Sequence, residues 1–242
     1  RYGIPRSFVQ DERKLEEAGQ RLAFEFLLEQ QGNPTLEKYF YTVGFEELWR
    51  GLFAPLAETY FSVVREQDLP AMAERQIDAL SGEFRQVRDR LREIAEEIGG
   101  MPRDVSDSVT AAAESCRRLL PWIETMGGND GAGGEWAPAA GEYAAGQETA
   151  NPRAMIGQLF GYRLPGGKTT REEVLILKEL TAEGRDLRDR LIRLDEVLSE
   201  QDDYREMFRL LALFRERVVS EKRKTGIVSF SDIMEMAIDI LT

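Results

Sequence analysis

The side chains best suited to bind a charged ligand in this 242-residue chain are arginines and lysines that gather at two places. The first is a row with steps of three and four residues, formed by Arg85, Arg88 and Arg92. The second lies near the carboxyl end and contains Arg217, Lys222, Arg223 and Lys224. A helix places such steps on one face, and rows of this kind contact nucleic acid phosphates without reading bases. The intervening Asp89 is equally typical of a solvated, salt-bridged helix surface, so both interpretations stay open.

Side-chain combinations that catalyse reactions are missing from the sequence. The chain has no His, which removes Ser-His-Asp triads and the His-containing zinc and di-iron motifs. Its one Cys, Cys116, forms no internal disulfide. Adjacent acidic pairs such as Glu96 and Glu97 point about 100° apart on a helix, which favours solvated faces over metal sites. We therefore predict no catalytic residue, metal site or cofactor site in this chain.

A turn at 164–170 contains the Gly-Lys-Thr sequence that closes a phosphate-binding P-loop. A P-loop also needs Gly six positions before its Lys, where this chain has Tyr162, and a buried strand before the loop. Neither requirement is met. The sequence instead predicts a turn whose Thr169 or Thr170 caps the following helix.

Composition narrows the class of protein further. The hydrophobic fraction of 42% and the charged fraction of 31% are typical of a globular chain. A net charge of −12 argues against a protein that coats nucleic acid by bulk charge. No apolar run approaches the roughly 18 residues of a membrane span, so we expect no membrane partner, and the single Cys favours a cytoplasmic protein. Because Arg1 stands where an initiator Met would, we expect a piece of a longer chain.

Helical periodicity dominates the sequence and predicts an all-α helical bundle. Helices are expected over about 10–31, 104–126, 201–224 and 232–241. Another is expected to carry a stripe of apolar side chains and to kink at Pro55; the stripe is Leu48, Leu52, Leu56 and Tyr60. A Gly- and Ala-rich loop at about 127–152, with isolated Trp136 and Tyr143, is not expected to build a core.

Two further segments carry heptad seams of apolar residues. One seam is Ile77, Leu80, Phe84, Val87, Leu91, Ile94 and Ile98. The other is Leu177, Leu180, Gly184, Leu187, Leu191, Leu194 and Leu198, in which only Gly184 lacks an apolar side chain. Two helices with narrow seams of similar length favour a long antiparallel pair. Each seam is also compatible with dimerisation with another chain.

The two ends of the chain resemble the UvrD/RecB/AddA group of superfamily-1 DNA helicases. The carboxyl-terminal match runs over 221–233, where a basic helix end leads into Val228-Ser229-Phe230-Ser231-Asp232-Ile233, followed by Ala237 and Leu241. Phe230 and Asp232 carry the family motif, whereas Val228 and Ile233 replace Leu and Ser229 replaces Asp. Segments 8–12, 33–36 and 44–48 are similar to the region after motif Ia in RecB-like and AddA-like proteins.

The resemblance implies that residues 1–225 form the helical 1B insertion domain, and that 226–242 belong to the parent's ATPase core. Such a parent is a bacterial, cytoplasmic helicase or helicase-nuclease of DNA repair and recombination, similar to the exonuclease V beta subunit or to AddA. The parent would use ATP and Mg²⁺, with its P-loop before Arg1 and its Walker B residues after Thr242. This piece would contact forked or duplex DNA without sequence specificity and would have no ATPase site.

A competing hypothesis is an interaction or scaffold module that docks a partner subunit through apolar helix faces. Charge reversal at Lys222, Arg223 and Lys224 should weaken DNA binding if the first hypothesis is right. Polar residues at Leu91 and Leu191 should abolish partner binding if the second is right.

Overall fold

The computed structural model describes residues 2–5, 10–102, 106–126, 151–164 and 171–241. The prediction of an all-α fold is confirmed, since none of these residues forms a β-strand. Several predictions fall outside the described residues: Phe8 and Val9 of the family resemblance, residues 127–150 of the Gly- and Ala-rich loop with Trp136 and Tyr143, and the turn at 165–170.

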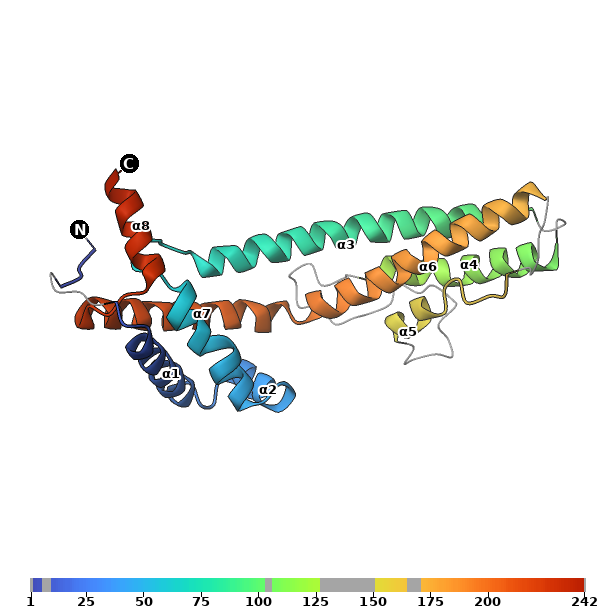
Figure 1. Ribbon diagram of the computed structural model, residues 1–242. Coiled ribbons are helices and arrows are strands. Elements are labelled where there is room, and N and C mark those ends of the chain that lie inside the picture. Colours follow the sequence, from blue (N-terminus) through green and yellow to red (C-terminus); the bar gives the residue numbers. More distant parts are fainter. Residues whose placement is uncertain (1, 6–9, 103–105, 127–150, 165–170, 242) are drawn as a thin grey trace. The chain divides into compact units, whose positions relative to one another are not determined.

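The described helices include eight α-helices and two π-helical segments (Figure 1). They are α1 (Glu12–Glu29), α2 (Pro34–Thr42), η1 (Glu47–Phe53), η2 (Leu56–Tyr60), α3 (Leu69–Gly100), α4 (Asp107–Thr125), α5 (Pro152–Gly157), α6 (Glu172–Ser199), α7 (Gln201–Thr225) and α8 (Phe230–Leu241). Side-chain caps fix several starts: Asp11 accepts a hydrogen bond from the Lys14 amide at 3.1 Å, and Asn33 accepts one from the Leu36 amide at 3.2 Å.

The segment expected to be a kinked α-helix is instead π-helical on both sides of Pro55. The Ala54 amide donates to the Trp49 carbonyl, and the Phe61 amide donates to the Leu56 carbonyl, which are both five-residue steps. Proline has no amide hydrogen to continue an α-helical ladder, so the helix accommodates it by widening its turns.

The chain divides into two compact units. The first unit contains residues 1–76 and 201–242, and the second unit contains residues 77–200. Helix α8 belongs to the same unit as α1 and α7, and the expected boundary at 225/226 stays a prediction. Polar contacts between α7 and α8, described below, explain why the two helices stay together.

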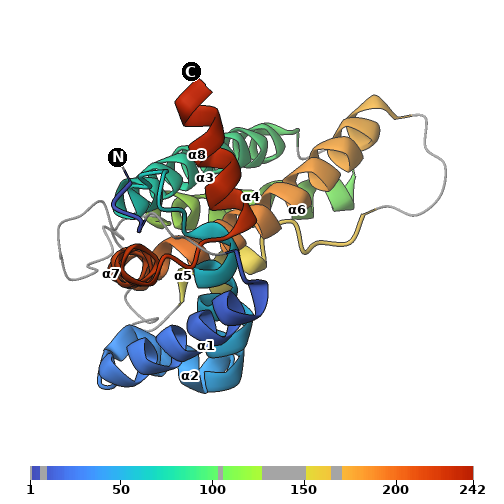
Figure 2. The same ribbon diagram turned by 60° about the vertical axis from the view of Figure 1, so that its left-hand side comes forward.

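The core of the first unit is built from aromatic rings of α1, η1 and α7. Phe26, Phe53 and Phe214 pack with ring centroids 5.1 to 5.7 Å apart. Helix α1 lies beside η1 and η2 and also contacts α7, which Figure 2 shows nearly end-on. The buried side chains of α1 include Leu15, Leu22 and Phe26, which recur at helical spacing on one face.

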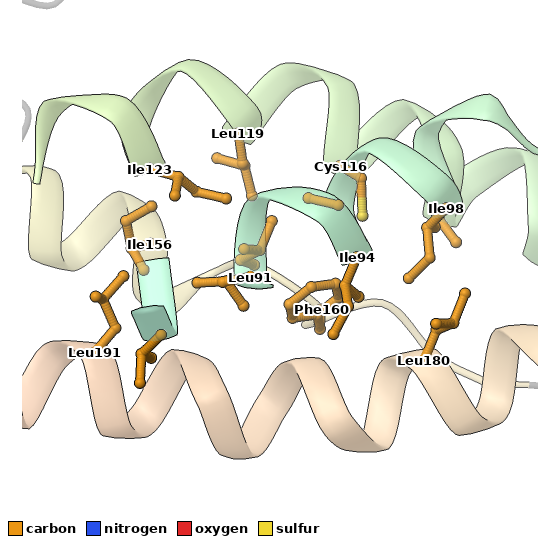
Figure 3. Close-up of a cluster of buried hydrophobic side chains, with 14 of the residues drawn as sticks. Leu91, Ile94, Ile98, Cys116, Leu119, Ile123, Ile156, Phe160, Leu180 and Leu191 are labelled. Atoms are coloured by element: carbon orange, nitrogen blue, oxygen red, sulfur yellow. The ribbon is translucent and has the colours of Figure 1, made fainter. Parts of the chain in front are cut away.

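The core of the second unit gathers most residues of both predicted seams around α4 and α5 (Figure 3). Arg90 bonds Glu183 at 2.8 Å and Arg190 bonds Glu83 at 2.7 Å, so residue numbers rise on α3 as they fall on α6. This pairing makes the two helices antiparallel. The seam residues share their core with Cys116, Leu119 and Ile156, and a direct knobs-into-holes pairing of the two seams stays a prediction.

Gly184, the one gap in the α6 seam, is occupied by a ring from elsewhere in the chain. A Cβ atom at Gly184 would lie 2.5 Å from the ring of Phe160, which is fully buried and has a φ of 62°. Figure 3 places that ring in the same cluster as Ile94 and Leu180. The small residue therefore makes room for Phe160 in the core.

Candidate functional site

The basic run at the end of α7 does not stay at the surface, because Lys222 turns inward. Its Nζ donates to the Phe61 carbonyl at 2.7 Å and to Oδ2 of Asp232 at 3.0 Å. The side chains of Lys222 and Asp232 are only 5% and 1% exposed. Gly226, with a φ of 71°, follows α7 and makes the turn that returns the chain to Asp232.

Asp232 is the centre of a polar network at the start of α8. It accepts hydrogen bonds from the Ser229 amide at 2.9 Å, the Ser229 hydroxyl at 2.8 Å and the Val63 amide at 2.9 Å. The Asp232 amide donates in return to the Ser229 hydroxyl at 3.1 Å. This reciprocal pattern is a capping box, with Asp in the position that Glu usually takes.

The electrostatics of this network favour an ionised Asp232. Burial acts to raise the pKa of the carboxyl, but the Lys222 ammonium and the amides of Ser229 and Val63 outweigh it. The pKa of Asp232 is therefore lowered from its ordinary value of 3.8. A buried charge pair with every oxygen bonded holds α7, α8 and the segment at 61–63 together.

These contacts leave only some of the carboxyl-terminal basic residues at the surface. Lys222 was expected at a nucleic acid surface, but its ammonium is used inside the first unit. Arg217 is tied to Glu25 at 3.0 Å and to Glu29 at 2.5 Å. Arg223 and Lys224 are exposed. They are the two members of this group that are exposed.

Each arginine of the α3 row has at most one carboxylate partner among the described residues. Arg85 is exposed and has no ion-pair partner among the described residues. Arg88 lies 3.4 Å from Asp89, and Arg92 lies 3.8 Å from Glu96, which are both loose contacts with surface carboxylates. On the inward face of the same helix, Phe84 and Leu91 are buried in the core. The second unit therefore carries three arginines along one side of α3, with Arg85 and Arg92 exposed and Arg88 half-buried.

Two arginines of α6 stabilise the segment that carries Phe160. Arg185 donates to the carbonyls of Phe160 at 3.0 Å and Tyr162 at 3.2 Å, and Arg188 donates to the carbonyl of Leu159 at 2.8 Å. The sequence analysis had no signal for this role, because the acceptors are backbone atoms. Cys116 is equally structural, since burial raises the pKa of its thiol to about 12 and leaves it protonated.

Helix α8 has an exposed apolar face that the sequence analysis did not single out. Its members are Phe230, Met234, Ala237, Ile238 and Leu241. They recur at helical spacing on one side, and Ile238 is 56% exposed and Leu241 is 86% exposed. In the sequence, this face was indicated by apolar residues at helical spacing from Phe230 to Leu241 and by an Asp in the first turn of the helix.

The candidate site consists of cationic side chains on α3 and at the end of α7. Within the part of the chain that the structure describes, His, Cys, Asp and Glu side chains form no group of three or more that could hold a metal ion. The helices among the same residues are too short or too polar to cross a membrane. Comparisons of the chain with known protein families, curated proteins and solved structures found no match.

Proposed function

We propose that this chain is an accessory helical domain of a bacterial, cytoplasmic superfamily-1 DNA helicase or helicase-nuclease that acts in DNA repair. The proposal rests on the sequence resemblance at its two ends. ATP and Mg²⁺ would act elsewhere in the parent. The role of this piece is to hold forked or duplex DNA by its phosphates, beside the parent's motor.

One observation carries the DNA-binding part of this proposal. Arg85, Arg88 and Arg92 lie along one side of α3, with Arg85 and Arg92 exposed and Arg88 half-buried, and none has a tight ion-pair partner among the described residues. The steps between them span about 5 to 6 Å along the helix, which suits contact with successive phosphates. Arg223 and Lys224 add two exposed cations to the first unit. Binding through so few charges is weak, non-specific and strongly dependent on salt.

Fluorescence anisotropy with forked, duplex and single-stranded DNA tests the proposal. We expect the triple variant Arg85→Gln, Arg88→Gln, Arg92→Gln to weaken fork binding at about 50 mM salt by at least about tenfold. The matched control removes the same charge from exposed positions in the same unit, as Arg117→Gln, Arg118→Gln, Arg193→Gln. Equal losses in the two variants would mean that bulk charge, and not the α3 row, binds DNA.

The Arg223→Gln, Lys224→Gln variant tests the first unit separately. A smaller loss than that of the α3 variant is expected, because two charges are removed in place of three. No binding by the unaltered chain to any of the three DNAs at about 50 mM salt would reject the DNA-binding role.

A second candidate function is the docking of a partner through an apolar face, and the exposed face of α8 favours it. The heptad seams are unsuitable for this purpose, because Leu91 and Leu191 are fully buried within the chain. Polar substitutions there would disrupt the core and not a partner interface. Met234 and Ile238 are exposed, so their substitution tests docking without opening the core.

A further inference from the structure

A groove of about 340 Å³ lies at the N-terminal end of α8, within the first unit. Leu15 of α1 and Val228 and Phe230 at the start of α8 supply its apolar walls. Three carboxylates also line it, and they are Glu12, Glu16 and Glu58. The lining of the groove therefore combines apolar and acidic side chains.

The negative charge of this groove lacks a counterion in the described part of the chain. Glu16 accepts a hydrogen bond from the neutral Gln20 side chain at 3.2 Å, while Glu12 and Glu58 have no ion pair there. Burial, followed by the nearby charge of Glu16, raises the pKa of Glu58. The charge of Glu16 makes the electrostatic potential at Glu58 more negative, which favours an added cation there.

The groove continues into the exposed apolar face of α8, since Phe230 belongs to both. From Phe230 the face runs through Met234 and Ile238 to Leu241, about 16 Å along the helix axis. Together the groove and this face form one surface that has acidic side chains at one end and an apolar row along α8. An apolar face alone does not fix the orientation in which a partner binds, whereas an apolar face with acidic side chains at one end does.

We infer that this surface binds an amphipathic helix of a protein partner, whose apolar row lies along α8 and whose terminal Lys or Arg enters the groove at Glu12, Glu16 and Glu58. This inference rests on the docking role proposed for α8. Charge complementarity selects the occupant. A second copy of α8 does not fit, because the charged side chains of α8 are Asp232, Glu235 and Asp239, which are all acidic.

The probe is a fluorescein-labelled synthetic helix of about 18 residues, with Leu at steps of four, four and three residues and two Lys at one end. A matched peptide carries Glu in place of both Lys. We expect the Lys peptide to bind the full chain at least about tenfold more tightly than the Glu peptide in anisotropy titrations. Equal binding of the two peptides would overturn the assignment of the groove.

Variants of the chain separate the groove from the apolar face. Glu16→Gln with Glu58→Gln should lower the affinity for the Lys peptide about tenfold and should not lower the affinity for the Glu peptide. The exposed Glu114→Gln is the matched control. Met234→Ser should weaken both peptides, whereas Val197→Ser, an exposed apolar residue of the second unit, should weaken neither.

The outcomes distinguish the inference from the function on which it rests. If Met234→Ser weakens binding but the Glu variants do not, the docking role stands and the groove assignment fails. If Met234→Ser has no effect, both fail, and the DNA-binding proposal is untouched because no DNA is present. Sedimentation that shows a dimer abolished by Met234→Ser would overturn the inference in favour of self-association.

Discussion

The two units attach their helices to one another by different kinds of contact. In the second unit the cross-helix ion pairs, such as Arg90 with Glu183, lie at the surface, and apolar side chains fill the core between them. In the first unit a buried ion pair, Lys222 with Asp232, joins α7 to α8, and apolar side chains of α8 face outward. Helix α8 is therefore attached mainly by polar contacts at its buried turn.

Further polar contacts support the same attachment of α8. Glu235 accepts a hydrogen bond from the Ser62 hydroxyl at 2.5 Å and pairs with Arg65 at 3.2 Å, and the Tyr2 hydroxyl donates to Asp239. A helix attached in this way keeps its apolar side available for another molecule. In the second unit, by contrast, the apolar seams are buried in the unit's own core.

The largest expected effect comes from removing the buried cation. Lys222→Met leaves Asp232 charged and buried without its counterion, which should cost about 3 to 5 kcal/mol of unfolding free energy. Lys224→Met is the matched control at an exposed position and should cost less than about 0.5 kcal/mol. Urea denaturation followed by far-UV circular dichroism measures both. Equal small effects would contradict a structural role for Lys222.

A smaller effect is expected in the core of the second unit. Gly184→Ala adds a Cβ atom 2.5 Å from the Phe160 ring and should cost about 1 to 3 kcal/mol by overpacking. Gly82→Ala on α3 meets no atom within 4 Å and should instead stabilise the chain by about 0.5 to 1 kcal/mol.

The Gly184 prediction is sharpened by a double-mutant cycle. Adding Phe160→Leu to Gly184→Ala should recover part of the loss, because the smaller side chain gives the new methyl group room. Strict additivity of the two single changes would show that Gly184 and Phe160 are not coupled.

The smallest expected effect is a change in how stability depends on pH in the acid range. The lowered pKa of Asp232 means that its contribution to stability is fully present above about pH 5 and is lost as the pH falls below 3.8 towards the folded-state pKa. Asp232→Asn removes that titration, so its unfolding free energy should decline less steeply between about pH 4 and pH 2. Urea titrations at several pH values measure the slope. An unchanged acid slope would contradict the direction of the shift.

The periodic features of this chain were predictable from sequence, and its polar junction was not. Heptad spacing identified Leu91, Ile94 and Leu191 as inward-facing because apolar burial repeats along a helix. Lys222 has basic neighbours at the end of a helix, which is the usual setting of a solvated side chain. Its burial depends on the turn at Gly226 and on Asp232, ten residues away.

A local signal for part of that junction was present. Ser229 and Asp232 have the spacing of a capping box, which predicts the start of α8 without predicting the role of Lys222. The fit of Phe160 against Gly184 had no comparable signal, because it joins a loop residue to a gap on another helix. In both cases the missing information is a tertiary contact with no sequence period.

The salt dependence of DNA binding tests the central claim most directly. Measured from about 50 to 200 mM salt, the logarithm of the affinity for forked DNA should fall linearly with the logarithm of salt concentration. Loss of three phosphate contacts should make this slope shallower by about 2 to 3 in the Arg85→Gln, Arg88→Gln, Arg92→Gln variant. Identical slopes for the variant and the unaltered chain would contradict the claim that the α3 row holds DNA.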